Sequence, residues 1–171
     1  TQGYYSDYTK FSDSEAEAIR RYYDYMIRYE NLFFAPELQD VTMTHTGWDN
    51  YEYQCTSHKV SSYGEAGKIW MILREKDYRK CIYLLNLCGQ SEDYWNEGKE
   101  EPNIQKDIKF TVQVDTPVEK ICFSTPDGEN MDAIELSFTE RATKTGKFID
   151  FTVPSLNYWT TIWIDTRKET I

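Results

Sequence analysis

Residues 108–114 read IKFTVQV, in which apolar and polar side chains alternate. A period of two is typical of a β-strand that buries one face and exposes the other. Similar runs lie on both sides of this stretch, and turn residues such as Gly, Pro, Asp and Asn separate them. They cover residues 41–46, 68–74, 79–88, 118–124, 134–138, 148–153 and 159–164. About eight short strands with no helix between them predict a mainly β protein, an antiparallel β-sandwich over residues 37–171.

Residues 1–36 follow a different period. Ser12 and Glu15 have the spacing of a capping box, and apolar or aromatic residues then recur every three or four positions from Ile19 to Phe33. Pro36 disfavours helix at Ala35, so we expect one N-terminal α-helix that ends there. Its tyrosine-rich stripe suits an interface. Either the helix packs on the following domain, or it packs on a larger partner.

Composition excludes several classes of protein. The 171 residues are too few for a (β/α)8 barrel, which needs at least ~200 residues. The formal net charge of −10 argues against binding to nucleic acid or to an anionic membrane surface. No apolar run approaches the ~20 residues that span a bilayer. No signal peptide is visible and the chain begins at Thr1, so we expect a processed product or an excised segment.

Catalytic and metal-binding patterns are missing from the sequence. His45 and His58 are the only histidines, neither lies in a nucleophile–base motif, and we expect His45 on the apolar face of a strand. The acidic residues of segment 127–132 lack the EF-hand pattern, and no glycine-rich phosphate loop is present. Four cysteines without clustering predict buried free thiols, with one or two disulfides as the alternative. We therefore predict no catalytic residue, no metal and no cofactor.

Aromatic residues in two predicted loops are candidates for sugar binding. Trp48 and Asp49 lie in one loop, and Tyr94 and Trp95 lie in another. A sugar ring can stack on a flat aromatic side chain while its hydroxyls bond to neighbouring polar groups. The alternative is that these rings cover the ends of the hydrophobic core.

Four stretches resemble the C-terminal part of glycoside hydrolase family 66, the dextranases and cycloisomaltooligosaccharide glucanotransferases. Residues 148–159, FIDFTVPSLNYW, resemble the family's closing FTVPSLEYW element, with Asn157 in place of Glu. Residues 82–89, IYLLNLCG, followed by the Tyr-Trp-Asn of residues 94–96, are similar to its INLLG…NWRD stretch, although the Arg and Asp are not preserved. Residues 122–127, CFSTPD, resemble YLASPD, and residues 22–32, YYDYMIRYENL, resemble a helix near the end of the family's barrel.

The resemblance implies a parent enzyme that hydrolyses or transglycosylates α-1,6-linked glucan through a carboxylate nucleophile and a carboxylic acid/base. In that family the catalytic pair belongs to the barrel, so no catalytic residue is assigned to this chain. Residues 13–35 would be the last barrel helix, and the absent catalytic barrel would be the partner. A secreted, periplasmic or cell-surface location is also implied.

Three functional hypotheses follow. The first is a non-catalytic accessory β-sandwich that buttresses the barrel. The second is a carbohydrate-binding module that holds α-glucan with its loop aromatics. The third is a protein-interaction module that uses the acidic loop of residues 92–101.

Overall fold

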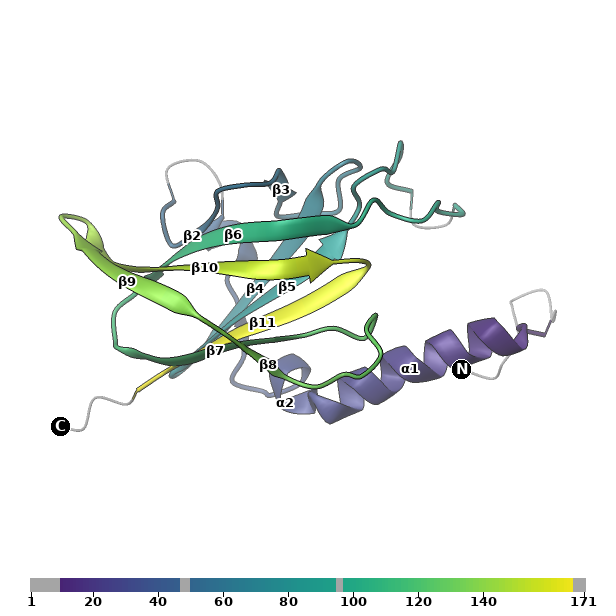
Figure 1. Ribbon diagram of the computed structural model, residues 1–171, viewed down its shortest axis with the longest axis horizontal. Helices are drawn as coiled ribbons and strands as arrows, with labels where there is room; N and C mark the ends of the chain where they lie inside the picture. Colours follow the sequence, from purple (N-terminus) through teal and green to yellow (C-terminus); the bar gives the residue numbers. More distant parts are fainter. Residues whose placement is uncertain (1–9, 47–49, 95–96, 168–171) are drawn as a thin grey trace. The chain divides into compact units, whose positions relative to one another are not determined.

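The computed structural model describes residues 10–46, 50–94 and 97–167 (Figure 1). Contacts divide the chain into two compact units, Thr1–Ala35 and Pro36–Ile171. The first unit is helical in its described part, and the second is built from two β-sheets. The mainly β, antiparallel fold class predicted from the sequence is confirmed.

The first unit contains α1 (Asp13–Arg28) and the short α2 (Glu30–Phe33). The predicted capping box is present: the Glu15 amide donates to Ser12 Oγ over 3.3 Å, and the Ser12 amide donates to Glu15 Oε2 over 2.8 Å. The helix is interrupted at Tyr29, so two helices stand where the sequence predicts one. The rings of Tyr25 and Tyr29 pack with centroids 5.1 Å apart. In the described residues, no helix is long and apolar enough to cross a membrane.

The larger sheet of the second unit has seven strands. Its order is β1 (Gln39–Asp40), β4 (Ile69–Lys76), β5 (Arg79–Asn86), β11 (Trp159–Thr166), β7 (Val118–Ser124) and β8 (Ile134–Leu136), with β3 (Val60–Ser61) beside β4. Apart from the parallel β3–β4 pair, neighbouring strands run antiparallel.

The smaller sheet has four antiparallel strands and forms the second layer of the sandwich. Its order is β2 (Tyr53–Cys55), β6 (Gln105–Val114), β10 (Gly146–Leu156) and β9 (Phe138–Thr143). Figure 1 shows this sheet layered across the larger one. The stretch IKFTVQV lies in β6, and its apolar residues face the larger sheet.

The hydrophobic core fills the space between the two sheets. Phe110 of β6 and Phe151 of β10 stack with centroids 5.5 Å apart. Alternate residues of the larger sheet meet them, and all of the following belong to the core cluster: Ile69, Met71, Leu73, Ile82, Leu84, Ile121, Phe123, Ile162 and Ile164. The alternation with a period of two therefore correctly predicted which side chains of the central strands face the core.

Two predicted strands are wrong in detail. Residues 41–46 contain the short helix α3 (Thr42–His45) rather than a strand. Threonine hydroxyls in this segment form hydrogen bonds with backbone groups. Thr42 Oγ1 accepts from the Leu73 amide over 2.9 Å, and Thr44 Oγ1 donates to the Val41 carbonyl over 3.1 Å. Residues 134–138 were predicted as one strand, but Leu136 pairs with β7 in one sheet and Phe138 pairs with β10 in the other. The chain crosses from sheet to sheet at Ser137.

Candidate functional site

Three of the stretches singled out in the sequence meet at one end of the sandwich, around the turn from β10 to β11. Asp127 Oδ2 accepts hydrogen bonds from the amides of Tyr158 and Trp159, each over 2.8 Å. Asn86 Nδ2 donates to the carbonyl of Asn157 over 2.7 Å and to that of Asn103 over 2.9 Å. Since backbone groups in a turn need partners, these two side chains fix the shape of this end.

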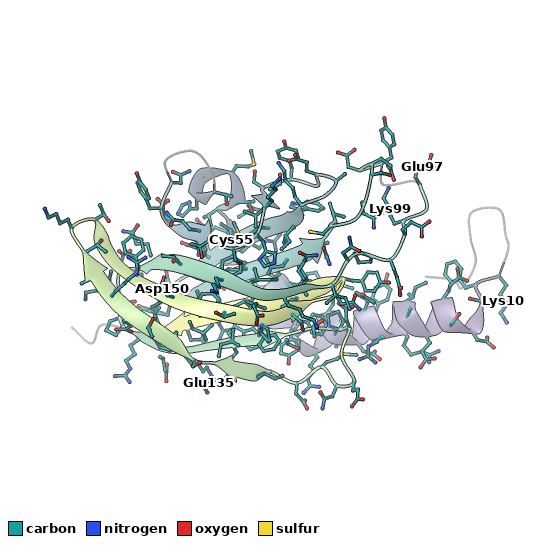
Figure 2. All side chains as sticks on the ribbon, turned by 45° about the horizontal axis from the view of Figure 1, so that its top comes forward. Lys10, Cys55, Glu97, Lys99, Glu135 and Asp150 are labelled. Atoms are coloured by element: carbon teal, nitrogen blue, oxygen red, sulfur yellow. The ribbon has the colours of Figure 1, made fainter. Side chains whose placement is uncertain are left out.

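The predicted sugar-binding residue Tyr94 lies in the β5–β6 loop at this same end, where the loop of Glu97 and Lys99 extends from the sandwich (Figure 2). Its side chain is 65% exposed, so it does not cover the core. Lys99 Nζ bonds to the Tyr94 carbonyl and to Glu92, and Lys99 thereby lowers the pKa of Glu92. Tyr158 is 40% exposed, and its hydroxyl donates to Glu101 Oε1 over 3.3 Å.

The other predicted sugar-binding residues, Trp48, Asp49 and Trp95, lie outside the described residues. The strands that follow the two loops nevertheless show how the loops are separated. Tyr53, at the start of β2, pairs with Val112 near the end of β6, whereas the loop of Tyr94 leads into the start of β6. Tyr53 and the start of β6 therefore lie toward opposite ends of the sandwich.

A surface that sequence reasoning missed is the outer face of the seven-stranded sheet, which we call the apolar outer face. Strand register places its side chains in rows that point away from the core, and the side chains at the centre of these rows are buried, with Cys81, Tyr83 and Trp163 no more than 6% exposed. The rows are Trp70–Leu85–Trp159, then Ile72–Tyr83–Thr161–Ser124, then Arg74–Cys81–Trp163–Cys122. The signal was present in β5 and β11, where residues 81–85 (CIYLL) and 162–164 (IWI) do not alternate with polar residues.

Ion pairs border the apolar outer face. Arg79 holds Asp165 with two hydrogen bonds, from Nε over 2.5 Å and from Nη2 over 2.9 Å, and these bonds raise the pKa of Arg79. Lys120 Nζ lies 3.9 Å from Asp165 Oδ2. An apolar centre with a charged margin is the usual composition of a protein–protein interface.

A polar cluster ties the two sheets together near the β4–β5 hairpin. The Tyr53 hydroxyl donates to Glu75 Oε1 over 2.6 Å, and Lys80 Nζ donates to the same oxygen over 2.7 Å. Burial disfavours the charge of Glu75, but the hydrogen bonds from Lys80 and Tyr53 outweigh it and lower the pKa of Glu75. Burial, with the charge of Glu75, raises the pKa of Tyr53.

The remaining reactive groups have local, structural surroundings. His45 lies in α3, not on a strand, and its Nδ1 is 2.8 Å from Thr44 Oγ1, while His58 Nδ1 is 2.6 Å from Ser57 Oγ. The four cysteines are free, and burial raises the pKa of the Cys81 thiol to about 11. Among the described residues, no group of three or more His, Cys, Asp or Glu side chains is placed to hold a metal ion.

Comparison with known proteins gives one family over most of the chain. The sequence profile described as Glycosyl hydrolase family 66 matches residues 1–163. Two proteins from Niallia circulans, each named cycloisomaltooligosaccharide glucanotransferase, are 28% and 24% identical to it over 164 residues. Each match covers 94% of this chain but only 16% of the relative.

A solved structure shares the fold. It is a cycloisomaltooligosaccharide glucanotransferase from Paenibacillus sp. in complex with cycloisomaltoheptaose. The TM-score is 0.78 at 20% sequence identity, over 93% of this chain and 23% of that one. The chain thus spans about a sixth of the curated relatives and under a quarter of the solved one.

Proposed function

The chain belongs to glycosyl hydrolase family 66, and on that premise we propose a function for it. It is the non-catalytic accessory β-sandwich of a dextranase-like enzyme that acts on α-1,6-glucan, and it braces the catalytic barrel of that enzyme. Residues 13–35, which contain α1 and α2, supply the last helix of the barrel. The proposal includes the secreted, periplasmic or cell-surface location expected from the resemblance.

The observation that carries the proposal is the apolar outer face. The outer side of a β-sandwich ordinarily faces water and carries polar residues. Here Trp70, Tyr83 and Trp163 are carried on the side of the larger sheet that points away from the core, and Tyr83 and Trp163 are only 5% and 6% exposed, so they are buried rather than open to water. Large aromatic residues inside a charged margin suit packing against another protein surface, and a catalytic barrel is the partner that the family supplies.

Incubation of the 171-residue chain with dextran tests the non-catalytic role. We expect no new reducing ends over the background of a buffer control. Steady release of reducing ends, lost after heat denaturation of the chain, would overturn the proposal.

The exposed tyrosines at the β10–β11 end favour a second candidate, a carbohydrate-binding module. Tyr158 presents its ring beside Glu101, Tyr94 is exposed in the same loop as Glu101, and an aromatic ring beside a carboxylate suits a sugar. On this alternative, a native gel that contains dextran retards the chain, and Tyr94→Ala or Trp95→Ala abolishes the retardation. Tyr78→Ala is the matched control, because Tyr78 is an exposed tyrosine in the hairpin at the opposite end. Equal mobility with and without dextran would exclude the alternative.

A further inference from the structure

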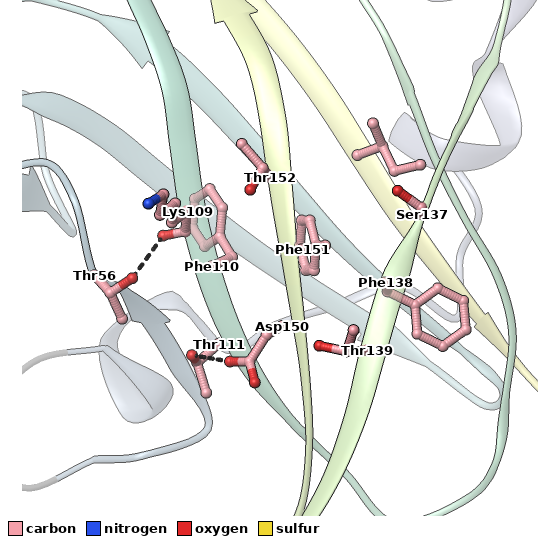
Figure 3. Close-up of a pocket in the computed structure, with 11 residues that line it drawn as sticks. Thr56, Lys109, Phe110, Thr111, Ser137, Phe138, Thr139, Asp150, Phe151 and Thr152 are labelled. Atoms are coloured by element: carbon pink, nitrogen blue, oxygen red, sulfur yellow. Dashed lines mark hydrogen bonds between the residues drawn. The ribbon is translucent and has the colours of Figure 1, made fainter.

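The outer face of the four-stranded sheet carries a hollow that crosses β6, β10 and β9 (Figure 3). We call it the cross-strand trough. Its volume is about 430 Å³, and Thr56, which follows β2, and Leu136 of β8 complete its lining. Since neighbouring strands are about 4.8 Å apart, the trough spans about 10 Å across the three strands. It is distinct from the loop tyrosines and from the apolar outer face, which belongs to the other sheet.

Strand register sets polar side chains side by side on the floor of the trough. Asp150 of β10 lies opposite Thr111 of β6 on one side and opposite Thr139 of β9 on the other. One step along the strands, Thr152 lies opposite Lys109. The core residues Phe110 and Phe151 alternate with them and turn their rings to the interior.

Asp150 is a fixed hydrogen-bond acceptor at the centre of the trough. The Thr111 hydroxyl donates to its Oδ1, as Figure 3 shows, and Arg141 Nε donates to its Oδ2 over 2.7 Å. These bonds outweigh the desolvation of Asp150 and lower its pKa. A carboxylate held in this way is pre-organised to accept further hydrogen bonds from a ligand.

Three donors around Asp150 remain available to a ligand. The Lys109 ammonium and the hydroxyls of Thr139 and Thr152 are exposed, and within the described residues they have no hydrogen-bond partner. Lys109 contributes its backbone carbonyl, rather than its side chain, to the bond with Thr56. The trough therefore combines one anionic acceptor, one cationic donor and two hydroxyls that can donate or accept.

This combination selects a class of ligand. Asp150 and the chain's net charge of −10 repel an anion, whereas Lys109 and Arg141 beside Asp150 disfavour a cation. Leu136 and Phe138 add partly buried apolar side chains to the lining, and the C–H faces of a sugar can pack on such side chains while its hydroxyls bond to polar neighbours. A neutral polyhydroxyl chain both donates and accepts hydrogen bonds along its whole length. We propose that the cross-strand trough binds a segment of neutral glucan, an inference that rests on the proposed function for the choice of glucan among polyols.

Titration of the isotope-labelled 171-residue chain with linear isomaltoheptaose, followed by amide NMR, tests the proposal. We expect saturable shifts at Lys109, Thr111, Thr139, Asp150 and Thr152. Shifts confined to residues of the β5–β6 loop would overturn it in favour of the loop tyrosines. No shifts at all would overturn it as well.

Two variants check that the trough residues themselves hold the sugar. The double variant Thr139→Val, Thr152→Val removes both hydroxyls and keeps β-branched side chains, so we expect about ten-fold weaker binding, as for the loss of two ordinary hydrogen bonds. Lys109→Gln removes the ammonium group, and we expect it to weaken the binding of isomaltoheptaose about three-fold. Lys106→Gln is the matched control, an exposed lysine of β6 outside the trough, and leaves affinity unchanged. Unchanged affinity in the double variant would overturn the proposal.

Failure of this proposal is distinguishable from failure of the proposed function. A chain that binds no isomaltoheptaose can still brace a barrel through its other sheet. Conversely, release of reducing ends from dextran would overturn the accessory role and leave the mapped binding surface unaffected.

Discussion

Asp127 and Asn86 show what the residues shared with the family do in this chain. Both residues lie in stretches that resemble the family. Both side chains form hydrogen bonds with the backbone of the β10–β11 turn instead of reaching into a pocket. Three of the four stretches are separated by many residues in the sequence and yet converge on one turn. Their resemblance to the family therefore reflects a structural requirement at this end of the sandwich.

Asp127→Ala leaves two turn amides without their acceptor. We expect the free energy of unfolding, measured by urea titration, to fall by about 1–3 kcal/mol. Glu129→Ala is the control, because Glu129 is exposed in the same loop and we expect almost no change. Equal effects of the two substitutions would contradict the structural role of Asp127.

Glu75 makes stability depend on pH in the acid range. Its pKa in the folded protein lies below the value of 4.5 that it has without these interactions, so the unfolded chain binds its proton more readily. Its contribution is complete above the unfolded pKa and is lost as the pH falls through the folded one. Urea titrations from neutral pH to below 4 should show this loss, and Glu75→Gln should reduce the slope. An unchanged slope in Glu75→Gln would show that other groups cause the acid sensitivity.

At the scale of elements, the sequence predicted the central strands and the capped helix, because their signals are local. The alternation of apolar and polar residues in IKFTVQV predicts β6, and the capping-box spacing of Ser12 and Glu15 predicts the start of α1. The error at residues 41–46 arose because threonine hydroxyls bonded to the backbone, which an alternating pattern does not reveal. The sheet change at Ser137 depends on the partners β7 and β10, so no local signal marks it. The trough was missed for the same reason, since its residues come from four strands.

Thr42→Val tests the account of α3. The Leu73 amide loses its acceptor, Thr42 Oγ1, in a buried position, so we expect a loss of about 1–3 kcal/mol in the free energy of unfolding. Hydrogen exchange at the Leu73 amide should become faster. Thr44→Val is the matched control in the same helix, where the threonine is exposed, and should cost less. A strand at 41–46 would instead tolerate Val at position 42 well.

At the scale of the whole molecule, the two sheets have different outer faces. The larger sheet carries aromatic residues outward and the smaller sheet carries threonine and charged residues, although both share one core. This asymmetry is what an accessory domain needs when one side packs on protein and the other faces solvent and polymer. The chain spans about a sixth of its curated relatives.

The most direct test of the proposed accessory role is a charge placed in the apolar outer face, within the longer enzyme that the proposal requires. Trp163→Lys puts an ammonium at a buried position in the row between Cys81 and Cys122, and Ser155→Lys puts the same group at an exposed position of β10. The measurement is the rate at which glucan-cleaving activity is lost on heating, with the unfolding free energy of each 171-residue variant as the reference. We expect Trp163→Lys to accelerate inactivation beyond what its effect on the 171-residue chain explains, and Ser155→Lys not to do so. Equal inactivation rates for the two variants would contradict it.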